Sequence, residues 1–496
     1  MEQNHIIHKV VIEVSVNNRE KAYEIKNDIS SFLTLDIFPK LEQHLSIAQA
    51  ALPAHTLQIS RLSIRLDESQ SSLNSTLQNS IMAYFKEELA ATLQPVLSGA
   101  YDAKNDSEIT LLGEEESLLR TFIHFLENGY MPWWNSNEKA TTILDPAAFE
   151  KIMAATAFAT TVANSIRKSE VRERMINQLT DTQLKKICFT VLKSKGLTIA
   201  VANTALQQLL GKSFIDRKVV WALILNVLNA ALSGSDAILE DYIVQETIRT
   251  VNNLKRIDHK NTEQIWNGIM TLFPFVQQKE DCTAISTKIA KIGKGAFEKA
   301  NGKNLKGDKN ERQTGSQPLN ADSNTETKIT AEINGYHVQN AGLVLIHPFI
   351  NNLFKHCNLI DPKTKKLIDP EIGIHLLHYI ATGKTNQPES SMLFEKFLCN
   401  IPMHQSISRH VKLSRRHKSE AAKVIAAVQQ NWSSMKTASV ALLQNEFFQR
   451  SGKLVLHNNQ TLTIERKTQD ILLEKISWGI GFIKLPWQNQ FIYVNW

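Results

Sequence analysis

The chain has 496 residues, of which 43% are hydrophobic and 21% are charged, and it carries a formal net charge of +7. This composition is typical of soluble globular domains and excludes a chain that is disordered throughout, and the length predicts about two to four domains. The mild positive charge allows an acidic partner without requiring one, and four widely spaced cysteines favour reduced, buried thiols over a disulfide framework or a zinc site.

The N-terminal part predicts a strand, a helical stretch and a second strand. Apolar and polar residues alternate over residues 10–16, which is the period of a half-buried strand. Helical spacing follows over residues 19–51, with a kink or break expected at Pro39. Apolar residues over 57–66 predict the second strand. The expected unit is β-α-β.

Residues 73–292 predict many short amphipathic helices with short connections. One apolar stripe over residues 118–126 is stopped by Gly129 and Pro132, and Trp133 and Trp134 follow directly. Further helices are expected near 146–167, 170–195, 200–210, 218–232, 237–254 and 261–273. Because no a/d heptad persists, a helical bundle or array is favoured over a coiled coil.

One apolar run, over residues 219–232, comes nearest to a membrane span. It is interrupted by Asn226 and Asn229 and falls short of the ~18 apolar residues that a span needs. A buried core helix is expected, with a segment that meets a membrane only after release from an assembly as the alternative. The N-terminus lacks the basic-then-apolar layout of a secretory signal, and no stable membrane insertion is predicted.

A polar segment and a second α+β region complete the chain. Residues 293–334 are rich in Lys, Asn, Gly, Ser and Thr and predict a flexible linker. Helices are expected over 338–359, 369–401 and 419–432, then a hairpin around 458–460, a short helix over 468–476 and two final strands.

The predicted fold is therefore mainly α with α+β ends. Its expected domains are an α+β domain over residues 1–100, a helical domain with a Trp-Trp turn over 101–292, the linker over 293–334, and a C-terminal α+β domain over 335–496.

No segment carries a convincing catalytic pattern. Gly383, Lys384 and Thr385 end like a phosphate-binding loop, but the earlier glycine is missing and a helix C-cap explains Gly383 better. Glu371, His375 and His378 share one helical face and could gather around a metal, yet histidines satisfied at the edge of a core are the preferred interpretation. We therefore expect no enzyme activity, no cofactor, no metal site and no small-molecule substrate.

Charge and aromatic clusters point instead to protein contacts. The basic segment over residues 409–418 could grip phosphate or an acidic surface, with a solvated loop and helix start as the preferred alternative. Large aromatic side chains gather in turns and at strand ends, where they anchor either cores or interfaces. The candidate interaction or packing residues are Trp133, Trp134, Trp478, Trp487 and Trp496.

Several of these segments resemble one protein family. The opening residues 5–14, the strand over 59–64 and the Gly-x-x-Pro-Trp-Trp turn over 129–134 are similar to tape measure proteins of contractile injection systems. The resemblance is most specific after the linker, over residues 340–349, 375–383, 393–402, 478–487 and 493–496. It is loose over 151–292 and absent from the linker.

The resemblance implies a structural component of a bacterial phage-tail-like particle that sets the length of the inner tube and sheath. Its implied partners are inner tube and baseplate hub proteins, with self-association as a further option. The expected location is the bacterial cytoplasm during assembly and then the tube lumen. The alternative is a folded assembly factor or chaperone that binds tube or baseplate subunits without measuring length.

Overall fold

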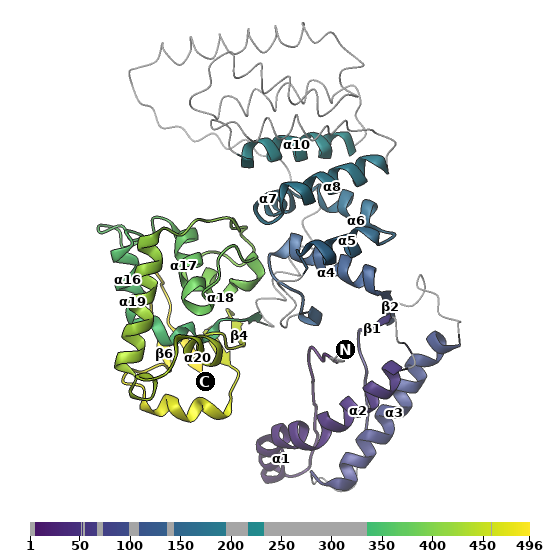
Figure 1. Ribbon diagram of the computed structural model, residues 1–496. Helices are drawn as coiled ribbons and strands as arrows, with labels where there is room; N and C mark the ends of the chain where they lie inside the picture. The colour runs from purple at the N-terminus through teal and green to yellow at the C-terminus, as the bar shows by residue number, and fades with distance from the viewer. Residues whose placement is uncertain are drawn as a thin grey trace, which may run out of the picture. The chain divides into compact units, whose positions relative to one another are not determined.

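The computed structural model describes residues 5–50, 52, 55–66, 73–98, 109–135, 143–194, 217–232, 335–457 and 459–496. The chain forms two compact units (Figure 1). Unit 1 comprises Met1–Arg120 and Lys151–Thr156, and unit 2 comprises Thr121–Glu150 and Ala157–Trp496. The described secondary structure is mainly helical with a few strands toward each end, which confirms the predicted fold class.

Unit 1 is built on helices that pack around two small apolar clusters. Asn18 and Asn74 cap two of these helices, because each side chain accepts a hydrogen bond from a backbone N–H of the first turn. A π-helical turn lies just before Pro39, where a kink or a break was predicted, but the backbone stays helical on both sides of it and no break occurs. The elements are α1 (Arg19–Phe32), η1 (Leu33–Ile37), α2 (Phe38–Ala50), β1 (His55–Ile59), α3 (Ser75–Leu97) and β2 (Ile109–Gly113).

The strand predicted over residues 10–16 is wrong, since these residues form no strand. β1 instead pairs antiparallel with β2, from His55 opposite Gly113 to Ile59 opposite Ile109. Leu57 lies opposite Leu111 in this pair, so β2 supplies the apolar cross-strand partner of β1. Alternation of apolar residues shows that a segment is able to form a strand, but it does not identify the partner strand.

Unit 2 begins with a stack of short helices. The capping box of Thr180 and Gln183 starts α8, and α10 packs on α7 and α8 (Figure 1). The interior of α10 is buried around Trp221, which confirms the predicted core helix. Among the described helices, none is long and apolar enough to cross a membrane. The chain passes between the two units within α4 (Glu114–Asn128) and within α5 (Pro146–Ala154). The other elements of the stack are η2 (Trp133–Asn135), α6 (Phe158–Ser165), α7 (Ser169–Gln178), α8 (Asp181–Lys193) and α10 (Arg217–Leu232).

The C-terminal part of unit 2 adds a five-stranded sheet in the order β3-β4-β5-β7-β6. β5 and β7 are parallel and the other neighbours are antiparallel. The predicted hairpin is confirmed as β4 and β5. The helix predicted over 338–359 is wrong at its start, because Val338 belongs to β3. Leu454, Leu462 and Val494 line the buried face of the sheet. The strands are β3 (Tyr336–Val338), β4 (Gly452–Val455), β5 (Gln460–Ile464), β6 (Phe482–Ile483) and β7 (Ile492–Asn495).

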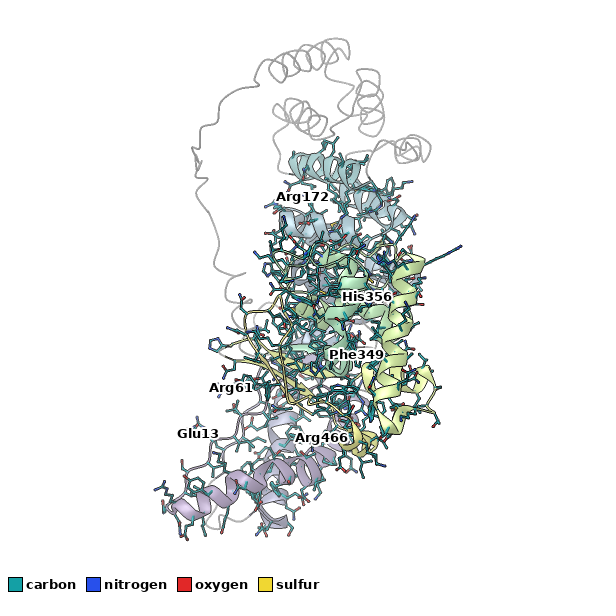
Figure 2. The ribbon with its side chains drawn as sticks, turned by 90° about the vertical axis from the view of Figure 1, so that its left-hand side faces the viewer. Glu13, Arg61, Arg172, Phe349, His356 and Arg466 are labelled. Atoms are coloured by element: carbon teal, nitrogen blue, oxygen red, sulfur yellow. The ribbon has the colours of Figure 1, made fainter. Side chains whose placement is uncertain are left out.

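Helices of the C-terminal region enclose a single large core. α16 and α17 both pack on the long helix α19, and Figure 2 labels Phe349 and His356 on α16. Asp369 caps the start of α17, and Gly383 ends it at a φ of 69°, which confirms the C-cap interpretation. The elements are η4 (Ala341–Ile346), α16 (His347–His356), α17 (Pro370–Thr382), η5 (Glu389–Ser391), α18 (Leu393–Leu398), α19 (Arg415–Asn431), η6 (Ser433–Met435), α20 (Val440–Leu443), η7 (Gln444–Phe448) and η8 (Thr468–Lys475).

Some predicted features lie outside the described residues. These are the helices over 200–210, 237–254 and 261–273, the linker over 293–334, and Cys282. The other three cysteines, Cys188, Cys357 and Cys399, are buried free thiols. The predicted domain boundaries near residues 100 and 293 stay predictions.

Candidate functional site: a buried ionic junction

The Glu371, His375 and His378 face of α17 belongs to the core. Glu371 is half-buried, while His375 and His378 are each only 3% exposed. His375 Nε2 lies 2.8 Å from the carbonyl oxygen of Ser408. Burial lowers the pKa of His375 to about 4, so the imidazole is neutral near pH 7 and Nε2 donates to that carbonyl. The core-edge interpretation is therefore confirmed for these two histidines.

The Trp-Trp turn packs at the end of α4. Trp134 donates from Nε1 to Oγ1 of Thr121 at 3.3 Å, and its ring meets that of His124 edge to face at 5.6 Å. Trp133 is 39% exposed and lies against Trp134 with 5.7 Å between ring centroids. The turn thus combines one anchored indole with one partly exposed indole.

The three C-terminal tryptophans are each held by a hydrogen bond from Nε1. Trp478 donates to Leu345 O at 3.0 Å, Trp487 to Leu398 O at 2.7 Å, and Trp496 to Asp470 Oδ2 at 3.1 Å. The ring of Trp487 also stacks on Phe354 with 5.3 Å between centroids. All five tryptophans predicted from the sequence take part in packing, and a contact with a partner protein stays a prediction for each.

The most unusual site in unit 2 is a buried cluster of three charged side chains. Glu389 of η5 lies between Arg174 of α7 and Lys396 of α18, and all three side chains are 0% exposed. Glu389 Oε1 is 2.7 Å from Lys396 Nζ, and Oε2 is 3.4 Å from Arg174 Nε. Buried charges are costly unless they are paired and fully hydrogen-bonded, so this cluster fixes a specific arrangement.

The remaining donors of the two cations satisfy the backbone of nearby segments. Lys396 Nζ donates at 2.6 Å and 2.7 Å to two carbonyls of the loop that follows α18. Arg174 Nη1 donates at 2.6 Å to the last turn of α4, and Nη2 donates to the same loop. The four acceptors are the carbonyl oxygens of Leu126, Met403, His404 and Gln405.

Two amide side chains of α7 extend the contact with this loop. Asn177 donates to Ser406 Oγ at 3.0 Å, and Gln178 donates to Ile407 O at 2.8 Å. Gln178 Oε1 in turn accepts from the backbone N–H of Glu389 at 3.0 Å. We call this set the Glu389 junction: Arg174, Asn177, Gln178, Glu389, Lys396 and residues 403–407.

Aromatic packing continues the contact toward the sheet. The ring of Tyr130, just after α4, meets Tyr336 of β3 edge to face at 5.2 Å between centroids. The ring of His124 also meets Tyr130 edge to face, at 5.3 Å. Burial raises the pKa of Tyr130 to about 12, so its hydroxyl stays protonated. Helical residues before the predicted linker are thus joined to strands after it.

A second buried polar cluster lies beside the junction. Glu395 Oε1 accepts from Asn340 Nδ2 at 2.7 Å and lies 2.9 Å from His378 Nδ1. The carboxylate belongs to the same short helix as Lys396, so α18 carries one charged residue into each cluster. This second cluster joins the residue before η4 to α17 and α18, while the junction joins α18 to η5 and α7.

The electrostatics suit a structural joint more than a reaction centre. Burial lowers the pKa of Lys396, whereas the neighbouring Glu389 acts to raise it. Every charged group of the junction is enclosed and none meets solvent. Within the described ranges, no group of three or more His, Cys, Asp or Glu side chains is placed to hold a metal ion.

Comparison with known proteins assigns the family. The family model for contractile injection system tape measure proteins matches residues 4–496, which is almost the entire chain. The chain belongs to this family. The family predicted from the sequence is therefore confirmed, and tape measure proteins of contractile injection systems are structural components. No match appears among curated proteins or among solved structures.

In this member of the family, the Gly-x-x-Pro-Trp-Trp turn meets the Glu389 junction. Gly129 has a φ of 84°, a left-handed conformation that ends α4. A Cβ at this position would lie 2.5 Å from Glu389 Oε1 and 3.0 Å from Arg174 Nη2. The absence of a side chain at Gly129 therefore leaves the space that the ion pair occupies.

The sequence alone does not indicate the junction. Arg174 and Glu389 are 215 positions apart, and each lies in a segment with ordinary charged neighbours. Nothing in the local periodicity distinguishes a buried arginine from an exposed one on a short helix. Gly129 was the one available signal, but it was interpreted only as a helix stop.

Proposed function

We propose that this chain sets the length of the inner tube and sheath of a contractile injection particle, in contact with inner tube and baseplate hub subunits. The observation that carries the proposal is the family match over residues 4–496. It would act as a structural component in the bacterial cytoplasm during assembly and then lie within the tube lumen.

The structure limits how such a measurement would be made. A continuous helix of 496 residues would span about 740 Å at ~1.5 Å per residue. The C-terminal region instead buries a large apolar core, which full extension would expose to water. We therefore assign anchoring to the folded ends, and the variable length to the part of the middle that lies between α10 and β3, residues 233–334.

A deletion series tests this assignment. Removing 30 residues from 293–334 leaves every described element intact, and it should shorten the tube by about 45 Å if the segment is helical or by up to about 100 Å if it is extended. An insertion of the same size should lengthen the tube by the same amount. Particle lengths are read by electron microscopy, and unchanged lengths in both variants would exclude the ruler role.

A second candidate function is a folded assembly factor that binds tube or baseplate subunits without measuring them. The Glu389 junction favours it, because extension of the chain would have to separate residues 126–178 from residues 389–407 and leave buried charges unpaired. This candidate predicts that the protein is absent from purified particles and that particle length does not change in the deletion variants. Mass spectrometry of purified particles separates the two functions.

A further inference from the structure

Three exposed aromatic side chains gather on the outward face of the C-terminal sheet. Phe482 of β6 lies opposite Tyr493 of β7, and Phe491 immediately precedes β7. Their exposed fractions are 67%, 49% and 47% respectively. The rings of Phe482 and Phe491 meet edge to face with 6.1 Å between centroids. We call these three residues and Lys484 the aromatic patch.

The fold does not use this patch for its own core. Along β7 the alternate residues Ile492 and Val494 point inward and are buried, which leaves Tyr493 on the outward face. The nearby tryptophans, in contrast, are tied to the fold by hydrogen bonds from Nε1. Contiguous exposed Phe and Tyr side chains are typical of the centre of a protein–protein interface.

The net charge of the C-terminal region indicates the kind of partner. Residues 335–496 contain 19 Lys and Arg but only 10 Asp and Glu, so their net charge of +9 exceeds the +7 of the entire chain. Lys484 Nζ lies 5.0 Å from the centroid of Phe491, and Lys453 of β4 is exposed on the same sheet. The five strands of this sheet contain no Asp or Glu. A complementary surface would carry carboxylates around an apolar centre.

We propose that the aromatic patch docks on an acidic protein surface with an apolar centre, belonging to another subunit of the particle. This inference rests on the proposed function and adds the anchoring surface of the C-terminal end. A protein partner is favoured over a nucleic acid, because the ring faces are already in contact. Lys484 lies over the ring of Phe491, and the rings of Phe482 and Phe491 pack against each other. Base stacking would need those ring faces to be free.

Binding of the full-length chain to purified inner tube subunits and to purified baseplate hub subunits tests the proposal. The double variant Phe482→Ala, Tyr493→Ala should weaken binding to one of them by about tenfold or more, as expected for interface anchors. Adding Lys484→Glu to the double variant should weaken binding further. Added salt should weaken binding by the wild-type protein. The matched control is Ile471→Ala, which removes an apolar side chain that is also 67% exposed but lies on η8.

The results of the binding experiment can be distinguished from those of the deletion series. Equal binding by the wild type and the double variant, or no binding to either subunit, would overturn the docking proposal, as would patch-dependent binding of single-stranded DNA alone. Circular dichroism and thermal unfolding must show that the variants are folded. A patch variant should reduce the number of particles without changing the length of those that form, whereas failure of the ruler role would show in the deletion series alone.

Discussion

Arg174 and Glu389 form a completely buried ion pair across 215 positions of the chain, with Arg174 Nε 3.4 Å from Glu389 Oε2. The pair joins a helix that precedes the predicted linker to a turn that follows it. A buried ion pair contributes little net stability, but removing one partner is strongly destabilising because the other charge stays buried and unpaired. The main effect of the pair is therefore to specify which segments meet. Unit 2 therefore behaves as one folded body in spite of the long intervening sequence.

Glu389→Gln should strongly destabilise unit 2. The substitution removes the negative charge from between Arg174 and Lys396, leaving two cations buried without a counter-ion, and the expected loss is ~3–5 kcal/mol in the free energy of unfolding. Urea unfolding followed by fluorescence measures the loss. Glu150→Gln is the matched control, because Glu150 pairs with Lys186 at the surface. This variant should lose only a small fraction of that free energy of unfolding. Equal effects of the two substitutions would contradict the role given to burial.

Gly129→Ala should destabilise the protein more than Gly383→Ala. Both glycines end helices in the left-handed conformation, so alanine costs about 1–2 kcal/mol at either position. Only Gly129 lies against the junction, where the added Cβ would overlap Glu389 Oε1, while the nearest atom to a Cβ at Gly383 is Gln444 Nε2 at 3.9 Å. Thermal unfolding of both variants measures how much more stability Gly129→Ala loses than Gly383→Ala. If Gly129→Ala loses no more stability than Gly383→Ala, the junction adapts to the extra atom.

The elements of this fold were more predictable than its contacts. Hydrophobic spacing and the residues around Asn459 predicted the β4–β5 hairpin, and Gly383 predicted the end of α17. The residues over 10–16 showed the same alternation as a true strand but form none, since a strand also needs a partner that local sequence does not name. The junction was unpredictable for the same reason: burial of Arg174 depends on a carboxylate 215 positions away.

The neutral state of His375 should make the stability of unit 2 depend on pH. Burial lowers its folded pKa to about 4 from the ordinary value of 6.5, so the unfolded chain binds more protons between these two values. Stability therefore falls as the pH falls through this window, by up to about 3 kcal/mol from this group at pH 4. Urea unfolding at several pH values measures the slope. His375→Gln keeps a donor for Ser408 O and should show a shallower slope, and an unchanged slope would assign the pH dependence to other groups.

Replacing the three charges together by methionine should fail to restore stability. Apolar substitution of a buried ion cluster is often neutral or stabilising when the charges pair mainly with one another. Here the cations also donate to four carbonyl oxygens. Those of Leu126 and Met403 are buried, and those of His404 and Gln405 are partly buried.

Each buried carbonyl left without a donor costs about 1–3 kcal/mol, so loss of the donors to Leu126 O and Met403 O should make the triple variant Arg174→Met, Glu389→Met, Lys396→Met about as unstable as Glu389→Gln. Urea unfolding gives the comparison, and limited proteolysis should cut first within residues 403–407, where the loop loses its donors. Stability equal to that of the wild type would instead show that charge pairing alone explains the cluster, and that water can replace the lost donors at the loop.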